Sequence, residues 1–167
     1  MFTRFRKYGS TTLLASVLTL SAAGVADAQN AVQTVPDSGI VRVKSAYSVD
    51  ETVKRLKADV ASKGIRFFEE IDQAKLAGDA GIKLRRSTLL VFGNPPLGTL
   101  FIAANPLAGL DWPVRLLVLE DEKGEVWAAY TDFSYIAHRH AITGADAEAF
   151  DKASGVIASI TSSVKAP

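Results

Sequence analysis

The chain has 167 residues, of which 48% are hydrophobic and 22% charged, and its formal net charge is +1. This length and composition predict a single globular domain and exclude a disordered chain or a protein with several membrane spans. The near-neutral charge gives no basis for binding nucleic acid. Since the chain has no Cys, it has no disulfide, no thiol nucleophile and no thiolate metal site.

The N-terminus is organised like a secretory signal peptide. Three basic residues and no acidic one precede an apolar run over residues 13–26, which is shorter than the ~18–20 residues a membrane-spanning helix needs. Ala-Asp-Ala at positions 26–28 predicts cleavage after Ala28. We expect residues 1–28 to be removed and the protein to be exported, either periplasmic or secreted, without membrane attachment. An uncleaved membrane anchor is the alternative.

The remaining chain is predicted to begin with a short, flexible polar lead-in, residues 29–38, followed by a single domain over 39–167. Alternating apolar residues predict a strand at 40–47. Ser48 and Glu51 then fit a capping box, in which each side chain bonds to the backbone amide of the other. Apolar residues at helical spacing continue this helix as far as a stop at Lys63 and Gly64.

The later elements follow from changes in hydrophobic period. We expect strands at 65–71, 84–92, 114–119 and 126–130, the last two joined as a hairpin, and short helices at 74–80, 97–104 and 133–140. A final helix is predicted over 143–165, with its cap within 143–146. The order β-α-β-β-β-β-α, with short helical inserts, predicts an α+β fold with a mainly antiparallel sheet of about five strands and the long helices on one face.

The segment VFGNPPLGT, residues 91–99, has nearly the spacing of a phosphate-binding P-loop, but the Lys of that motif is missing. Pro95 and Pro96 also lack the backbone N–H groups with which such a loop holds phosphate. Asn94 suits a helix N-cap and Pro95 suits the first helical position. The segment is therefore interpreted as a corner between a buried strand and a short helix.

Several segments resemble the exported members of the domain-of-unknown-function 302 family. They are Ile71-Asp72, residues 89–99, Pro106, Asp111-Trp112-Pro113, residues 127–130 and His140. The resemblance covers about residues 43–164 and implies one small α+β domain, often paired as a homodimer, without implying a reaction. Family members often have a His after the Asp of the ID motif, where this chain has Gln73. A metal or acid–base role for that His therefore does not carry over.

The other polar candidates form no complete catalytic set. His138 and His140 are the only histidines, and on a helix they diverge by about 200°, so we expect neither a metal site nor a cofactor. Asp72 could orient His140 for acid–base chemistry, with Tyr130 as a further candidate; the alternative is a structural His with a hydrogen-bond partner. Asp111 is also a candidate. The Arg85-Arg86 pair suits an anion but is more typical of a solvated strand edge. Trp127 could line either the core or a pocket, and the core is favoured.

Two hypotheses follow from these observations. The first is a non-enzymatic module that binds a small ligand or assembles as a homodimer, with its pocket or interface formed by Phe92, Gly93, Asn94, Pro95, Gly98 and Thr99. The second is an acid–base enzyme acting on a small substrate through Asp72 and His140. The enzyme requires those two side chains within hydrogen-bond reach, or one water, of each other.

Overall fold

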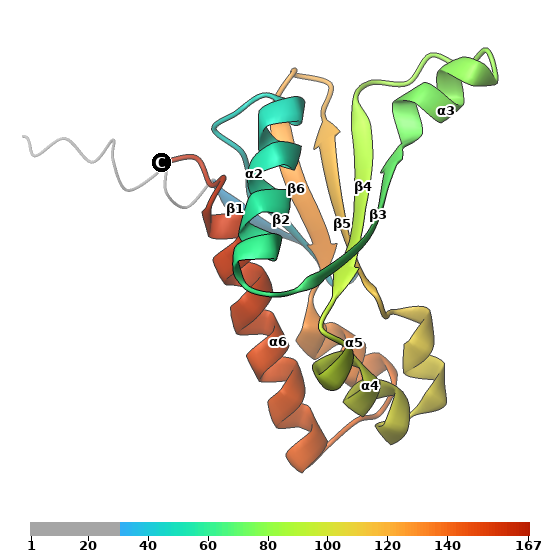
Figure 1. Cartoon of the computed structure of the whole chain (residues 1–167), viewed down its shortest axis with the longest axis vertical. Helices are drawn as coiled ribbons and strands as arrows, with labels where there is room; N and C mark the ends of the chain where they lie inside the picture. Colours follow the sequence, from blue (N-terminus) through green and yellow to red (C-terminus); the bar gives the residue numbers. More distant parts are fainter. Residues whose placement is uncertain (1–30) are drawn as a thin grey trace, which may run out of the picture.

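The computed structural model describes residues 31–167, apart from the side chains of 145–147. The predicted signal peptide, residues 1–28, lies outside the described residues. Along residues 31–167, no helix is both long enough and apolar enough to cross a membrane. Figure 1 shows a twisted sheet, two long helices packed against it, and shorter helices at its two ends.

The sheet has six strands in the order β1-β2-β6-β5-β4-β3, and every neighbouring pair is antiparallel. The strands are β1 (Val32–Val35), β2 (Ile40–Lys44), β3 (Arg66–Asp72), β4 (Ser87–Gly93), β5 (Val114–Glu120) and β6 (Val126–Thr131). The predicted α+β class with an antiparallel sheet is confirmed. The strand count differs because β1 lies within the predicted polar lead-in. All four β1 residues are exposed, so the sequence carries no burial pattern there, and the strand exists through its pairing with β2.

The helices are α2 (Val49–Ser62), α3 (Gln73–Asp79), α4 (Pro95–Ala104), the 3₁₀ helix η1 (Pro106–Leu110), α5 (Phe133–Arg139) and α6 (Ala145–Ser162). The two long helices, α2 and α6, pack against each other and lie along the same face of the sheet, as predicted (Figure 1). The Ser48 hydroxyl accepts from the Glu51 amide at 3.4 Å, which is half of the predicted capping box. The Glu51 carboxylate instead accepts from Arg55, at 2.8 Å.

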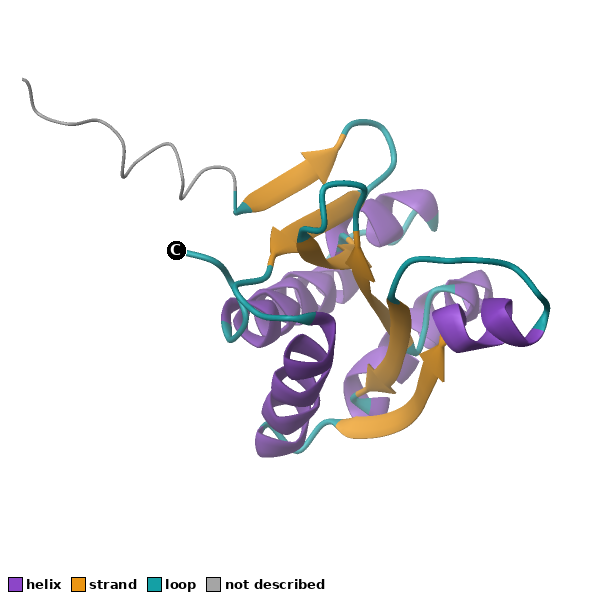
Figure 2. Cartoon of the chain, turned by 90° about the horizontal axis from the view of Figure 1, so that it is seen from above, coloured by secondary structure: helices purple, strands orange, loops and turns teal. Residues whose placement is uncertain are grey.

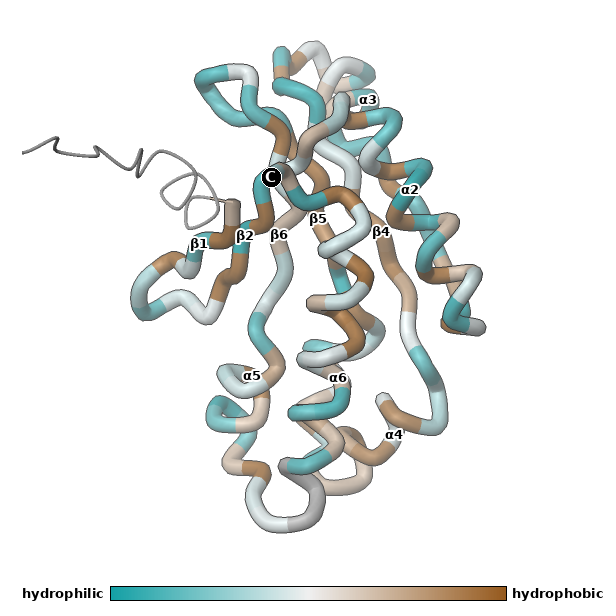
Figure 3. The backbone as a smooth tube through the Cα atoms, turned by 90° about the vertical axis from the view of Figure 1, so that its left-hand side faces the viewer, coloured by the Kyte–Doolittle hydropathy of each residue, from teal (hydrophilic) through white to brown (hydrophobic). Residues whose placement is uncertain are grey.

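The hydrophobic core lies between this face of the sheet and the two long helices. Leu90 and Leu116 from the strands and Leu56 from α2 are completely buried. Along β4, which is largely hydrophobic (Figure 3), alternate side chains point to opposite faces, so Leu89 and Val91 face away from the long helices and are only half-buried. The sheet is strongly twisted when viewed from above (Figure 2).

α6 begins within the predicted range, but without a side-chain cap. The N-cap residue is Gly144, at φ +71°, and no side chain makes a capping hydrogen bond there. A positive φ is readily adopted by Gly and costly for other residues. The turn into α6 therefore depends on backbone conformation at Gly144 and not on a side-chain cap.

Candidate functional site at the β4–α4 corner

The corner predicted from the segment VFGNPPLGT is confirmed. β4 ends at Gly93, and Asn94 is the extended N-cap of α4. Its side-chain Oδ1 accepts from the Leu97 amide at 3.4 Å, while its backbone carbonyl accepts from the Gly98 amide at 2.8 Å. Pro95 and Pro96 occupy the first helical positions, where a missing N–H costs no helical hydrogen bond.

The indole ring of Trp112, from the loop between η1 and β5, packs against the backbone of the two glycines of this corner. A Cβ atom on Gly93 would lie 3.0 Å from Trp112 Nε1, and a Cβ atom on Gly98 would overlap the indole ring. Phe68, on β3, also contacts the indole, in an edge-on arrangement with 6.0 Å between the ring centroids. The spacing that resembles a phosphate loop is thus explained by the close approach of an aromatic ring to the backbone.

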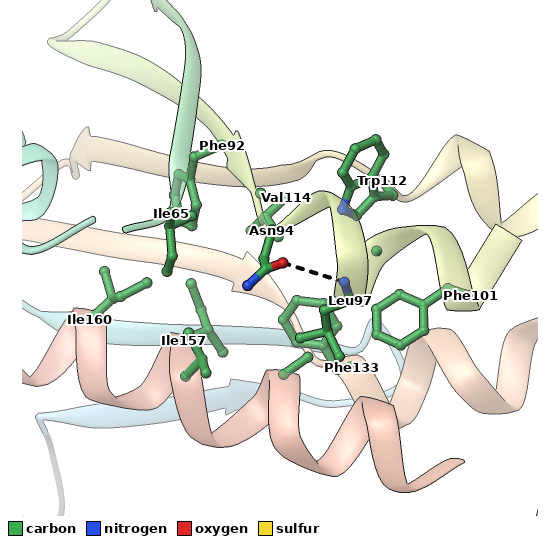
Figure 4. Close-up of a pocket in the computed structure, with 14 residues that line it drawn as sticks. Ile65, Phe92, Asn94, Leu97, Phe101, Trp112, Val114, Phe133, Ile157 and Ile160 are labelled. Atoms are coloured by element: carbon green, nitrogen blue, oxygen red, sulfur yellow. Dashed lines mark hydrogen bonds between the residues drawn. The ribbon is translucent and has the colours of Figure 1, made fainter. Parts of the chain in front are cut away.

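A cavity of about 40 Å³ lies between this corner and α6 (Figure 4). β4 and α4 contribute Phe92, Asn94, Leu97 and Phe101, and α6 contributes Ala153, Val156, Ile157 and Ile160. The rest of the lining, including Ile65, Val114 and Phe133, is also apolar. The Asn94 amide and the Trp112 indole N–H are the only polar side-chain groups that line it.

A larger hollow, of about 380 Å³, opens beside this cavity. Four residues line both spaces: Ile65, Asn94, Leu97 and Val156. The hollow is bounded further by Lys63, at the end of α2, and by Lys152, Gly155 and Ser159 on α6. The two spaces therefore share the wall that these four residues form.

The Asn94 side chain has a donor group, its Nδ2, that makes no hydrogen bond within the described residues. Its Oδ1 caps α4. The side chain lies at the mouth of the cavity, above the apolar residues of α6 (Figure 4). The corner therefore offers one amide donor to any molecule that enters from the hollow.

The structure brings together four of the six residues predicted at this site. Phe92, Gly93, Asn94 and Gly98 line the cavity. Pro95 begins α4 outside the lining, and the Thr99 hydroxyl is turned back to the Pro95 carbonyl at 2.7 Å. Sequence reasoning missed the α6 side of the cavity. The apolar period of that helix predicted a buried face but could not identify what the face packs against.

The predicted pair of Asp72 and His140 is not formed. The Asp72 carboxylate caps α3 and accepts from the Lys75 amide at 2.9 Å. His140 Nε2 instead lies 2.7 Å from Asp111 Oδ2, and the two side chains are only 6% and 9% exposed. The backbone of His140 is also held, because its carbonyl accepts from Asn105 Nδ2 at 2.9 Å.

Asp111 joins three elements at the lower end of the sheet. Besides His140, its carboxylate lies 3.3 Å from the Arg139 guanidinium and 3.6 Å from that of Arg115. A small cavity of about 20 Å³ beside it is lined by Asp111, Val114, Arg115, Thr131, Phe133 and Ile136. This arrangement fits the alternative in which His140 is a structural residue with a hydrogen-bond partner.

The other polar candidates also have structural partners. Partial burial raises the pKa of Tyr130, with the Asp132 carboxylate adding to the effect, and a hydrogen bond with Thr161 of α6 opposes it. Arg86 donates a hydrogen bond to the Asp50 carboxylate. This hydrogen bond and the negative charge of Asp50 raise the pKa of the guanidinium. Tyr130, Asp72 and His140 thus take part in three separate sets of contacts.

Trp127 is buried, as predicted, and its indole Nε1 donates to Asp121 Oδ2 at 2.9 Å. Among the side chains that the structure describes, no group of three or more His, Asp or Glu is arranged to hold a metal ion. The apolar cavity at the β4–α4 corner is therefore the candidate site with the most complete geometry.

A family model shows the family of this chain, and a solved structure is similar to it in fold. The family model described as "Domain of unknown function DUF302" matches residues 41–160. A crystal structure of an uncharacterized conserved DUF302 protein from Bacillus stearothermophilus is similar in fold, with a TM-score of 0.69 at 16% identity, covering 77% of this chain and 99% of that one.

Two curated relatives are named fluoride-specific ion channel FluC 1. The proteins from Brucella suis biovar 1 and Brucella abortus biovar 1 are each 38% identical to this chain over 109 residues, which is 65% of this chain. The match spans 43% and 40% of those proteins, so this chain accounts for about two fifths of their length.

Proposed function

Because the chain belongs to the DUF302 family, whose function is unknown, we propose that it is a binding module for a small, largely apolar molecule. The observation that carries this proposal is the paired cavity and hollow at the β4–α4 corner, with apolar walls and one unused amide donor on Asn94. Binding sites for small molecules are typically concave, mostly apolar and supplied with a few polar groups that fix the orientation of the ligand. The hollow is also in the usual range of size for such sites, about 300–1,000 Å³.

The enzymatic alternative has less support. Acid–base catalysis needs groups that can exchange a proton with a substrate in a cleft. Asp72 is used as a helix cap and His140 is buried against Asp111. The small cavity beside Asp111, about 20 Å³, offers a substrate little room.

The relatives from Brucella favour a module over a self-contained enzyme. They are named as channels, and the matched segment is less than half of their length. A domain that is combined with other sequence in its relatives fits a binding or assembly role. Ion conduction does not enter our proposal for this chain, because the name applies to the whole of those longer proteins.

Homodimeric assembly is a second proposal, and exposed leucines near the same corner favour it. Leu100 of α4 and Leu107 and Leu110 of η1 are 48%, 65% and 64% exposed. Large apolar side chains that gather on a surface commonly mark an interaction site. We also propose export with cleavage near Ala28. Native mass spectrometry of the exported protein tests both ideas: a monomer that retains Met1 contradicts them.

The binding proposal is tested by titrating the protein with 1-decanol while following tryptophan fluorescence. Trp112 borders the cavity, so binding should change its emission, and a Trp112→Phe variant should lose the change. Asn94→Ser keeps a helix-capping oxygen but removes the amide donor. We expect it to fold normally and bind decanol about tenfold more weakly, which corresponds to a hydrogen bond of about 1.4 kcal/mol.

Asn94→Ala separates the two roles of the side chain, because it loses the cap as well as the donor. It should bind as weakly as Asn94→Ser and should also be about 1 kcal/mol less stable to unfolding. Wild-type protein that shows no saturable binding of decanol or of its carboxylate counterpart, decanoate, would refute the proposed function. If Asn94→Ala changes stability alone, Asn94 has no role in binding and is only a cap.

A further inference from the structure

We propose that the molecule bound at this corner is a free carboxylate with an unbranched apolar tail, and that Lys63 and Lys152 bind its carboxylate while the tail lies in the hollow. This inference rests on the proposed function and specifies its ligand class. The lining of the hollow next to the cavity suggests it, because apolar side chains are joined there by two lysines, Lys63 just after α2 and Lys152 on α6, which we call the rim.

The charge at the rim matches a single negative charge. Lys152 is exposed and makes no ion pair within the described residues. Lys63 donates to Asp59 at 2.6 Å, which leaves two of its three N–H donors for other partners. Two lysines beside one aspartate carry one net positive charge, so a monoanion neutralises the rim. A phosphate with two charges would leave an excess negative charge next to Asp59.

The surface of α6 is shaped to leave room for this ligand. Lys152, Gly155, Val156 and Ser159 lie at helical spacing and form one stripe along the hollow. Gly155 is inside the helix, where glycine is less favourable than alanine. A Cβ atom there would meet no other atom within 4 Å, so close packing within the chain does not explain the glycine. The space above Gly155 is part of the hollow itself.

The tail has an apolar surface to pack against within the hollow. Val156 and Leu97 line both the hollow and the cavity and form part of this surface. Beyond them lie Ile157 and Phe101, which are buried. Asn94 Nδ2, between the two spaces, can donate to a carboxylate oxygen as readily as to a hydroxyl.

The experiment compares decanoate with 1-decanol at pH 8, where the carboxylic acid is fully ionised, by calorimetry and by the fluorescence of Trp112. We expect the wild-type protein to bind decanoate at least tenfold more tightly than decanol. The double variant Lys63→Gln/Lys152→Gln should bind the two molecules equally. Lys123→Gln, at the far β5–β6 turn, is the matched control for loss of a positive charge and should keep the preference.

A third variant tests the position of the tail. Gly155→Leu fills the hollow and replaces a poor helix former with a good one, so the protein should fold at least as well as the wild type. We expect its affinity for decanoate to fall tenfold or more. Decanoate binding that is unaffected by Gly155→Leu would overturn the proposed position.

The outcomes separate this inference from the proposed function. If decanol and decanoate bind equally to the wild type, or if the preference survives loss of both lysines, the carboxylate inference is wrong while the apolar site remains. If neither molecule binds, the proposed function fails and the ligand class fails with it.

Discussion

The contact between Gly98 and Trp112 leads to a prediction about stability. Replacing Gly98 by Ala places a Cβ atom inside the Trp112 indole, so either the ring or α4 must move. Overpacking of this kind costs about 1–3 kcal/mol, and alanine in a helix recovers about 0.5–1 kcal/mol. We therefore expect Gly98→Ala to lower the free energy of unfolding by up to about 2.5 kcal/mol.

Gly155→Ala is the matched control, since it makes the same substitution inside α6 where nothing lies within 4 Å of the new methyl group. It should raise the free energy of unfolding by about 0.5–1 kcal/mol. Urea unfolding followed by circular dichroism measures both variants. The helix-propensity gain is common to the two, so the difference between them isolates the clash with Trp112.

The double variant Gly98→Ala/Trp112→Leu gives a further check, because removing the indole should make the alanine harmless and the two substitutions strongly non-additive. If Gly98→Ala is as stable as Gly155→Ala, the indole does not rest on the Gly98 backbone. The interpretation that the Trp112 ring requires glycine at these two positions would then be refuted.

Two further predictions concern carboxylates. Asp111→Asn weakens the contacts to His140 and the two arginines. We expect the free energy of unfolding, measured in urea, to fall by about 1.5–3 kcal/mol without loss of decanol binding. Unchanged stability would contradict the structural role of the Asp111–His140 pair. Partial burial raises the pKa of Asp121, but hydrogen bonds from the amides of Glu125 and Lys123 and from Trp127 outweigh it and hold the pKa below its ordinary 3.8. As the pH falls below 3.8, Asp121 becomes protonated in the unfolded chain while it is still ionised in the folded protein. The ionised carboxylate therefore stabilises the fold fully above pH 3.8, and this stabilisation is lost as the pH falls through the lower pKa of the folded protein. The stability advantage of the wild type over Asp121→Asn should therefore shrink in acid unfolding measurements, and an advantage that is constant down to pH 2 would refute this.

Most of the fold follows from local patterns. In α2, the capping Ser48, the apolar spacing through Leu56 and the positive φ of Gly64 are all short-range features, and the helix begins and ends as predicted. The strands β4 and β5 have enough alternation to be placed within a few residues. β1 could not be placed in this way, because its side chains are exposed and its stability comes from hydrogen bonds to a neighbouring strand.

The candidate site likewise has features that the sequence predicts locally and features that only the fold determines. The Asn94 cap and the prolines after it are chemically local, so the corner could be recognised from seven letters of sequence. The partner of His140 could not, because Asp72 and Asp111 are equally plausible acids until the sheet places them at opposite ends. Pairing between side chains that are far apart in the chain depends on strand order and register.

The sequence by itself excluded cysteine chemistry and a phosphate-binding P-loop, and it determined the α+β class. Each of these depends on residue type or on a hydrophobic pattern that repeats within a few residues. The tertiary structure alone decided that α6 closes the corner and that the Trp112 ring occupies the space a Cβ atom of Gly98 would need. It also decided that Lys63, just after α2, and Lys152, on α6, line one hollow. A cavity is the space between elements, and its shape depends on how their side chains meet when the chain packs.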